Sequence, residues 1–208
     1  MYELYYSPGT ASFAVHWLLV EMSLPHTLRL VDFATRQQKS ADYLRLNPDG
    51  VVPTLMIDGV AHSESAALVL TLADRHPDRG LAPAPAERAA YYQWAFYCAN
   101  SLQPAFRNWF YAPEAAGPED EVKAHARGRI ERCWDRFEAH FADGRTHLLG
   151  ERLTAADFLV TMLMRWSRNM PKPVTQWPAL ARYVQRMRAM PSFRETYARE
   201  GLTDWVNT

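Results

Sequence analysis

The hydrophobic positions of the first 76 residues change their spacing from one segment to the next. Short apolar runs such as YELYY at residues 2–6 alternate with stretches whose apolar residues recur every three or four positions. The first pattern is typical of strands and the second of amphipathic helices. Strands that alternate with helices predict a mixed four-stranded sheet with a right-handed crossover. The predicted order is strand, helix, strand, helix, two strands and helix, over residues 2–6, 12–24, 28–33, 41–46, 54–57, 60–62 and 65–76.

After residue 76 the composition changes and the spacing becomes helical. The segment HPDRGLAPAPAE at 76–87 is rich in proline, which is typical of a linker. Apolar residues then recur every three or four positions over 92–110 and again over 122–141. These two stretches predict long helices with one buried face each, and the first is expected to kink at Pro104.

Capping and proline signals mark the start of three further helices. Thr154 can cap a helix and Asp157 can reach back to the Thr154 amide, while Pro178 and Pro191 each fall where a first helical turn would lie. The predicted domain organisation is an α/β domain over 1–76, a linker over 77–85 and an all-helical domain over 86–208.

Composition narrows the classes of function. The 208-residue chain is 48% hydrophobic and carries 23 basic and 23 acidic side chains. Without an excess of either charge, neither a nucleic acid nor a membrane surface is expected as a partner. No apolar run approaches the ~20 residues of a membrane span, and the first ten residues lack signal-peptide features, so a cytoplasmic location is expected. The histidines and cysteines show no metal-ligand spacing, and we expect no metal.

The segment NPDGVVPTL at 47–55 places a proline directly before a predicted strand. Proline has no backbone N–H and cannot donate to a sheet. Pro53 therefore either marks the edge of the strand or holds the preceding backbone free for another partner. The pattern alone leaves both interpretations open.

Four motifs, taken together, resemble the cytosolic glutathione transferases, and in particular the bacterial beta class or a related bacterial class. The resemblance implies a thioredoxin-like N-terminal domain with a mixed four-stranded sheet, followed by a C-terminal helical bundle. It also implies a homodimer that uses glutathione as a co-substrate. The motifs are YYSPGTAS (5–12), NPDGVVPTL (47–55), HSESAAL (62–68) and GERLTAADF (150–158), in this order and at the spacing of the family.

The resemblance also assigns glutathione-binding residues. Pro53 would be cis, and Val52 would offer its N–H and C=O to the cysteinyl unit as an added strand would. Ser65 and the amides at the start of its helix would bind the γ-glutamyl carboxylate, with Glu64 near the ammonium. The alternatives are a trans Pro53 at a strand edge, and Ser63 or Ser65 as an ordinary helix cap. The cations that could meet the glycyl carboxylate are Arg36 and Lys39.

A family member must favour the thiolate of glutathione, because a free thiol with a pKa of about 8.5 is mostly protonated near neutrality. A hydroxyl that donates a hydrogen bond to sulfur, helped by the positive end of the first helix, would do this. The beta class has a cysteine where this chain has Ala11, so cysteine-based thiol exchange is not expected. The candidate hydroxyls are Ser12, Thr10 and Tyr6.

The helical domain is expected to contribute a pocket for a hydrophobic electrophile. Gln103 and Pro104 stand where the beta class has a histidine and a lysine, and an aromatic stripe here is also typical of a helical core. The predicted function is conjugation of glutathione to hydrophobic electrophiles. The alternatives are a non-catalytic glutathione-binding or protein-interaction module of the same fold, or isomerisation, dehalogenation or peroxide reduction with glutathione. The candidate pocket residues are Asn100, Gln103, Phe106 and Arg107.

Overall fold

The computed structural model describes residues 1–205, and residues 206–208 of the predicted helical domain lie outside this range. Contacts divide the chain into two compact units. The first unit joins residues 1–82 to the C-terminal stretch that starts at 188, and the second unit covers residues 83–187. This division differs from the predicted domain boundaries mainly in the C-terminal stretch, which by its contacts belongs to the first unit.

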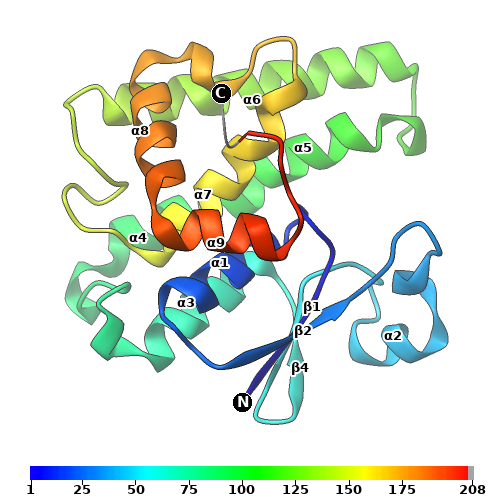
Figure 1. Cartoon of the computed structure of the whole chain (residues 1–208). Coiled ribbons are helices and arrows are strands. Elements are labelled where there is room, and N and C mark those ends of the chain that lie inside the picture. The colour runs from blue at the N-terminus through cyan, green and yellow to red at the C-terminus, as the bar shows by residue number, and fades with distance from the viewer. Residues whose placement is uncertain (206–208) are drawn as a thin grey trace. The chain divides into compact units, whose positions relative to one another are not determined.

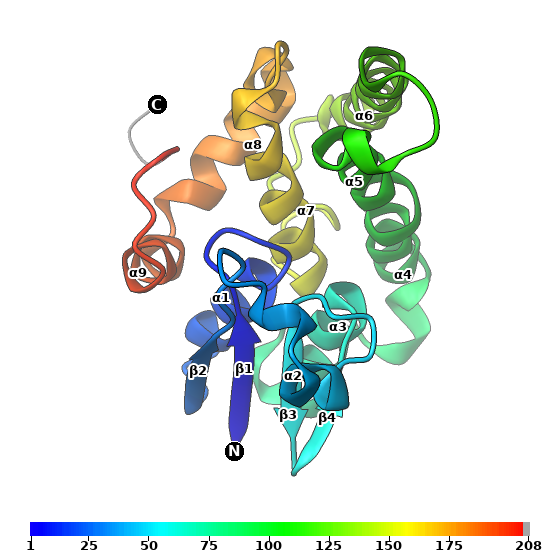
Figure 2. The same cartoon turned by 90° about the vertical axis from the view of Figure 1, so that its right-hand side faces the viewer.

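A four-stranded mixed sheet forms the centre of the first unit, as the strand pattern predicts. The strand order is β2-β1-β3-β4 (Figure 2). Strand β1 pairs in parallel with β2 and antiparallel with β3, and β3 and β4 form an antiparallel hairpin. The predicted turn of this hairpin is confirmed, with Asp58 and Gly59 at φ 51° and 84°, as a tight two-residue turn requires. The strands are β1 Tyr2–Tyr6, β2 His26–Leu30, β3 Thr54–Ile57 and β4 Val60–His62.

The second strand lies earlier in the chain than predicted. It begins at His26, and its last ladder pair joins Leu30 to Tyr6, the final residue of β1. One more backbone hydrogen bond, from Val31 N–H to the Tyr6 carbonyl at 2.8 Å, closes this edge. The predicted end at Phe33 is therefore wrong, because a strand cannot extend beyond the partner that satisfies its backbone groups.

Helices cover both faces of this sheet. Helices α1 and α3 lie on one face and the short α2 lies on the other (Figures 1 and 2). Every residue of α1 from Phe13 to Val20 is buried, which explains why all of them except His16 are apolar. The helices of the first unit are α1 Phe13–Glu21, α2 Ala41–Leu46, α3 Ser65–Arg75 and α9 Pro191–Arg199.

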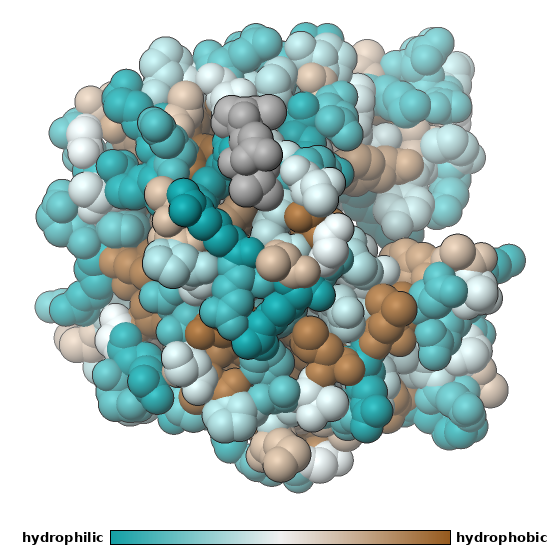
Figure 3. Space-filling view, viewed as in Figure 1, coloured by the Kyte–Doolittle hydropathy of each residue, from teal (hydrophilic) through white to brown (hydrophobic). Residues whose placement is uncertain are grey.

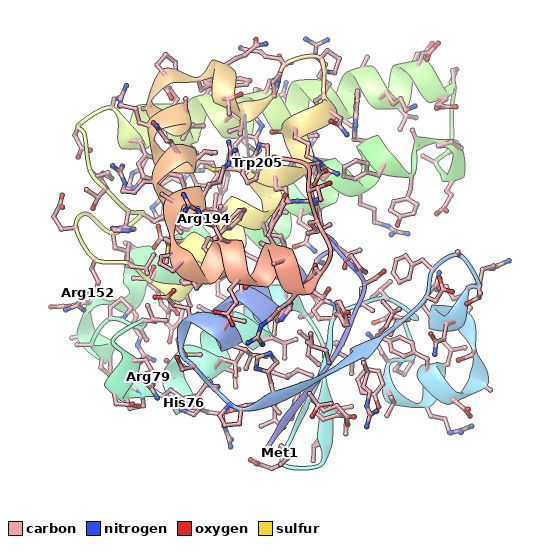
Figure 4. All side chains as sticks on the ribbon, viewed as in Figure 1. Met1, His76, Arg79, Arg152, Arg194 and Trp205 are labelled. Carbon is pink, nitrogen blue, oxygen red and sulfur yellow. The ribbon has the colours of Figure 1, made fainter. Side chains whose placement is uncertain are left out.

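The last helix joins the first unit because it packs on α1. Trp17 donates a hydrogen bond from Nε1 to Ser192 Oγ at 2.9 Å, and the ring of Phe13 meets Phe193 edge-on at 5.7 Å. Beyond the helix lies Trp205, which Figure 4 labels. Its ring is 5.1 Å from the Arg188 guanidinium. Buried aromatic and hydrogen-bonded contacts thus hold α9 against α1, although the two helices are far apart in the sequence.

The second unit is helical between residues 83 and 187. Its central helix α7 is buried from Ala155 to Arg165. Helix α6 begins three residues before the predicted position, because Glu119 and two further acidic residues in its first turn favour a helix N-terminus. The helices are α4 Arg88–Tyr97, α5 Gln103–Phe110, α6 Glu119–Phe141, α7 Ala155–Trp166 and α8 Pro178–Ala189, the last of which continues past residue 187.

Pro104 breaks the predicted long helix rather than simply kinking it. A π-helical segment, Cys98–Leu102, separates α4 from α5, and Pro104 lies in the first turn of α5. Proline lacks the N–H that would bond to the Asn100 carbonyl, and its ring would clash with that carbonyl in a regular helix. The wider π segment accommodates both effects, so the interruption precedes the proline.

Short 3₁₀ turns connect the longer elements. Two of them occupy the proline-rich segment that was predicted as a linker, and proline lies in the first turn of each. The 3₁₀ turns of the described chain are Gln37–Lys39, Pro77–Arg79, Pro85–Glu87, Ala112–Glu114, Ser167–Asn169 and Val174–Gln176.

The visible surface agrees with the balanced composition. Figure 3 shows one face of the molecule, on which hydrophilic residues predominate and hydrophobic residues form small separate patches.

Among residues 1–205, no helix is both long enough and apolar enough to cross a membrane. In the same part of the chain, no group of three or more His, Cys, Asp or Glu side chains is arranged to hold a metal ion.

The predicted capping box at the start of α7 is confirmed, and it is more extensive than predicted. Asp157 Oδ2 accepts hydrogen bonds from the Thr154 N–H and hydroxyl, both at 2.9 Å. Asp157 Oδ1 accepts from the Leu148 N–H at 2.9 Å and from the Tyr183 hydroxyl at 3.0 Å. Four donors thus converge on one fully buried carboxylate.

We predict that Asp157→Asn lowers the free energy of unfolding by about 3 kcal/mol, because the amide NH₂ would face donors that need an acceptor. Urea denaturation measures this change. Asp143→Asn is the matched control, since Asp143 is exposed and its side-chain bonds within residues 1–205 all go to Arg145 in the same turn. Equal urea midpoints for the Asp157 variant and the unmodified protein would contradict the structural role of this carboxylate.

Candidate functional site

The loop after β1 gathers three hydroxyl-bearing residues around one carbonyl. Thr10 Oγ1 donates to the Ser7 carbonyl at 2.7 Å, and Ser12 Oγ donates to the same carbonyl at 3.1 Å. The two hydroxyl oxygens lie 3.0 Å apart, and Ser12 Oγ also accepts from the Ser7 N–H at 3.3 Å. The loop therefore forms a compact hydrogen-bonded turn immediately before α1.

The two predicted catalytic hydroxyls of this loop differ in exposure. Ser12 is fully buried and its hydroxyl is bonded inside the loop, whereas Thr10 is only half-buried. Ser12 stands directly before α1 but makes no side-chain capping bond to that helix. Of the two, Thr10 is the residue whose side chain solvent or a ligand can reach.

Tyr6, the third candidate, is the last residue of β1 and is half-buried. Burial raises the pKa of its hydroxyl, and the negative charge of Glu200 raises it further. Tyr6 therefore stays protonated near neutral pH, and its neutral hydroxyl can donate a hydrogen bond. Its ring lies 6.0 Å from that of His16 on α1.

Glu200, at the end of α9, fixes the same loop from a distant part of the sequence. Its Oε2 accepts from the Gly9 N–H at 2.8 Å, and its Oε1 lies 2.8 Å from His16 Nδ1, which donates to it. Both side chains are completely buried. No sequence motif marks Glu200 as a site residue, because nothing local connects position 200 with a loop at the other end of the chain.

The segment before β3 lies at the same end of the sheet as this loop. Tyr5 pairs with Thr54 in the antiparallel ladder, so the chain enters β3 beside the point where it leaves β1. The predicted cis peptide bond between Val52 and Pro53 is confirmed. The Val52 side chain is buried with Val31 and Tyr43.

The backbone of Val52 is free, as the second interpretation of Pro53 required. Within residues 1–205, neither the N–H nor the C=O of Val52 has a hydrogen-bond partner. The side chain is only 6% exposed, so packing holds the residue while its peptide groups stay available. Unpaired peptide groups beside a strand can bind an extended peptide.

The segment 36–39 packs closely against the turn before Val52. Lys39 Nζ donates to the Asp49 carbonyl at 3.0 Å. At Gly50, with φ 61°, an added Cβ would lie 2.7 Å from the Gln38 carbonyl oxygen and 2.8 Å from Lys39 Nζ. Only glycine fits this close approach. Arg36 is exposed and has a left-handed backbone, with φ 57°.

Glu64 and Ser65 begin α3 in a conformation that a simple cap does not explain. Glu64 is exposed and has φ 71°, which is uncommon for a residue other than glycine. Ser65 is buried, and its hydroxyl donates to the Ala11 carbonyl at 2.9 Å instead of capping the helix. This bond joins the start of α3 directly to the loop that carries Thr10.

The predicted electrophile residues all lie in the second unit, and their environments differ. Asn100 and Arg107 are exposed, and Gln103 is half-buried. Phe106 is completely buried, with its ring edge-on to Trp166 at 5.7 Å. Its position is therefore that of a core residue, because the helical apolar stripe that contains it packs inward.

A cavity of about 380 Å³ is also present in the second unit. It lies between α4 and the segment 145–152, and its lining includes Trp94, His140 and Arg152. None of the predicted electrophile residues belongs to this lining. The cavity and the predicted pocket are thus separate features.

Two family models match the chain. The glutathione S-transferase N-terminal domain matches residues 10–75, and the glutathione S-transferase C-terminal domain matches residues 120–186. The first match contains Thr10, Val52, Glu64 and Ser65. The second begins after the π-helical segment and ends within α8.

Relatives and solved structures resemble the chain over almost its whole length. Glutathione S-transferase GST-4.5 of Xanthomonas campestris is 34% identical over 206 residues, covering 96% of this chain and 99% of that protein. Glutathione S-transferase GstA of Escherichia coli O157:H7 is 31% identical, with 96% and 99% covered. A crystal structure of a glutathione transferase homolog from Sulfitobacter with bound glutathione has a TM-score of 0.89 and 28% identity, with 98% and 99% covered.

We predict that Glu200→Gln lowers the free energy of unfolding by about 2 kcal/mol or more, because the amide NH₂ would face either the Gly9 N–H or His16. Urea denaturation measures the loss, and faster hydrogen exchange at the Gly9 amide locates it in the loop. Glu195→Gln is the control, since Glu195 lies on α9 with its side chain 51% exposed. A Glu200 variant as stable as the Glu195 variant would contradict the anchoring role.

Proposed function

Because the chain belongs to the glutathione S-transferase family, we propose that it adds the thiol of glutathione to hydrophobic electrophiles. The observation that carries the proposal is the bond from Ser65 to Ala11, which joins the start of α3 to the Thr10 loop. This bond supports the proposal, because it brings the residues proposed to bind the γ-glutamyl end close to the loop of the hydroxyl proposed to meet the sulfur. The free peptide groups of Val52 lie at the same end of the sheet.

In this proposal, the peptide backbone of glutathione pairs with Val52. The N–H and C=O of Val52 bond to the cysteinyl unit in the way that an added strand would, with Pro53 closing the ladder on that side. The pairing fixes the cysteinyl Cα, and so the direction of its thiol. Two observations support this assignment: the peptide groups of Val52 have no hydrogen-bond partner within residues 1–205, and its side chain is buried.

The charged ends of glutathione meet residues on either side of Val52. The γ-glutamyl carboxylate binds at the N-terminus of α3, an 11-residue helix whose first amides lack intrahelical partners, with the Ser65 hydroxyl beside it. Glu64 attracts the neighbouring ammonium. At the other end, Lys39 and Arg36 attract the glycyl carboxylate.

Thr10 is the proposed thiol-activating residue. Its hydroxyl proton turns from the Ser7 carbonyl to the sulfur, and Ser12 continues to hold that carbonyl. A hydrogen bond to the thiolate, with the nearby N-terminus of α1, favours the anion and lowers the thiol pKa; the thiol proton passes to solvent. The thiolate then forms a C–S bond to the electrophilic carbon; with a chloronitrobenzene the C–Cl bond breaks and chloride leaves to solvent. Ser12 and Tyr6 support this geometry without contacting the sulfur.

The proposed electrophile-binding residues all belong to the second unit. Asn100, Gln103 and Arg107 have accessible polar groups that could orient a substrate. Disulfide exchange through a loop cysteine is not part of the proposal, because Ala11 stands at the corresponding position. The proposed substrate class is an electrophile that accepts a thiolate at carbon.

We further propose that the protein acts as a cytoplasmic homodimer. Tyr92 and Phe96 lie one turn apart on α4 and are 36% and 53% exposed. Aromatic side chains of this kind are enriched in protein interfaces. A second copy of the chain would bury them.

Thr10→Val is expected to raise the pKa of bound glutathione thiol by about one unit and to lower kcat/KM for a chloronitrobenzene at neutral pH about tenfold. The ultraviolet absorbance of the thiolate against pH gives the pKa, and a conjugation assay gives the rate. Thr10→Ser retains the hydroxyl and is expected to retain both properties.

Two results would count against this proposal. Tight glutathione binding with an unshifted thiol pKa and no conjugation would instead identify a non-catalytic binding module. Full activity in the Thr10→Val variant, with loss in Ser12→Ala, would move the activating role from Thr10 to Ser12.

Light scattering is expected to give twice the chain mass of 23.9 kDa. Phe96→Glu should shift the protein towards the single-chain mass, because a charge would be buried at the proposed interface. Gln93→Glu, at an exposed position on the same helix, is the control. A single-chain mass for the unmodified protein would refute the homodimer.

A further inference from the structure

The carbonyl that precedes Val52 is held by two side chains from α2 and its C-terminus. Tyr43 donates from its hydroxyl to the Val51 carbonyl at 2.7 Å, and Asn47 donates from Nδ2 to the same oxygen at 2.9 Å. Both side chains are buried, with 4% and 2% exposure. The two bonds occupy both lone pairs of the Val51 carbonyl and so fix the plane of the peptide that leads into Val52.

The Tyr43 hydroxyl also reaches the residue that follows the binding segment. Its oxygen lies 2.9 Å from Thr54 Oγ1, and Thr54 is fully buried. Because the single Tyr43 proton goes to Val51, the Thr54 hydroxyl donates to Tyr43. One phenol group therefore ties together the two residues that flank Val52 and Pro53.

The ring of Tyr43 holds the same segment through packing. It forms a buried cluster with Val31 and the Val52 side chain, and Tyr5 packs against this cluster with its ring 5.9 Å from that of Tyr43. The side chain of Val52 is thus fixed by apolar contacts, while its peptide groups have no bond partner within residues 1–205. Burial also raises the pKa of the Tyr43 hydroxyl, which therefore remains protonated as a donor.

We propose that Tyr43 is a positioning residue for glutathione: its hydroxyl fixes the 51–54 segment so that the peptide groups of Val52 face the cysteinyl unit in the orientation that binding needs. The inference rests on the proposed function, in which Val52 pairs with glutathione. A segment that is already ordered loses less conformational entropy on binding, so the hydroxyl contributes to affinity without touching the ligand.

Tyr43→Phe tests this inference, because it removes the hydroxyl and keeps the ring in the cluster. The Kd for glutathione, measured by calorimetry well below the unfolding temperature, is expected to rise about tenfold, the effect of one lost hydrogen bond. At saturating glutathione, kcat and the pKa of the bound thiol should stay close to those of the unmodified enzyme. Tyr5→Phe is the matched control, since Tyr5 packs on the same cluster but, within residues 1–205, its hydroxyl makes no hydrogen bond to the 51–54 segment.

A glutathione analogue separates positioning from general destabilisation. In the depsipeptide analogue whose Cys–Gly link is an ester, the cysteinyl carbonyl is a weaker acceptor for the Val52 N–H, which belongs to the peptide group that Tyr43 and Asn47 orient. The unmodified protein should bind it more weakly than glutathione, whereas Tyr43→Phe should lose little further affinity, because both changes affect the same interaction. Thr54→Val, which removes the donor to Tyr43, should weaken glutathione binding in the same direction but less.

The outcomes distinguish the inference from the function on which it rests. If the unmodified protein binds no glutathione, both fail. If it binds and conjugates glutathione but Tyr43→Phe has an unchanged Kd, only the positioning role of Tyr43 fails. Equal losses in the Tyr5 and Tyr43 variants, or fully additive losses with the depsipeptide, would likewise assign Tyr43 a purely structural role.

Discussion

The antiparallel register between β1 and β3 is the constraint on which the candidate site depends. Because Tyr5 lies opposite Thr54, the chain leaves β1 and enters β3 at the same end of the sheet. The Thr10 loop and the Val52 segment are therefore neighbours, although about forty positions separate them in the sequence. The ladder satisfies the backbone groups up to these points and leaves those of Val52 free for a ligand.

Burial gives different roles to chemically similar side chains in the Thr10 loop. A buried hydroxyl must keep a protein partner, since no water can replace a lost hydrogen bond. Ser12, which is fully buried, therefore holds the loop through the Ser7 carbonyl and cannot easily release it. Thr10 donates to the same carbonyl but reaches the surface, where a ligand or water can take its place.

The ligand-facing segments are fixed from behind by residues that do not face the ligand. Glu200 binds the Gly9 N–H of one segment, and Tyr43 binds the Val51 carbonyl of the other. Each anchor is a buried polar group that bonds to main chain, which is a stronger positional restraint than side-chain packing alone. The C-terminal stretch thus contributes to the first unit through chemistry as well as through its packing on α1.

The sequence by itself determined the features that nearby residues control. The hairpin at Asp58 and Gly59, the helix over 41–46 and the capping box of Thr154 and Asp157 depend on contacts within a few positions, and all were predictable. Only the tertiary structure decided where β2 ends, which hydroxyl is buried, that Phe106 faces the core and that Glu200 reaches Gly9. The reason is physical: burial and long-range hydrogen bonds depend on which distant segments come into contact. The local spacing of residues does not determine those contacts.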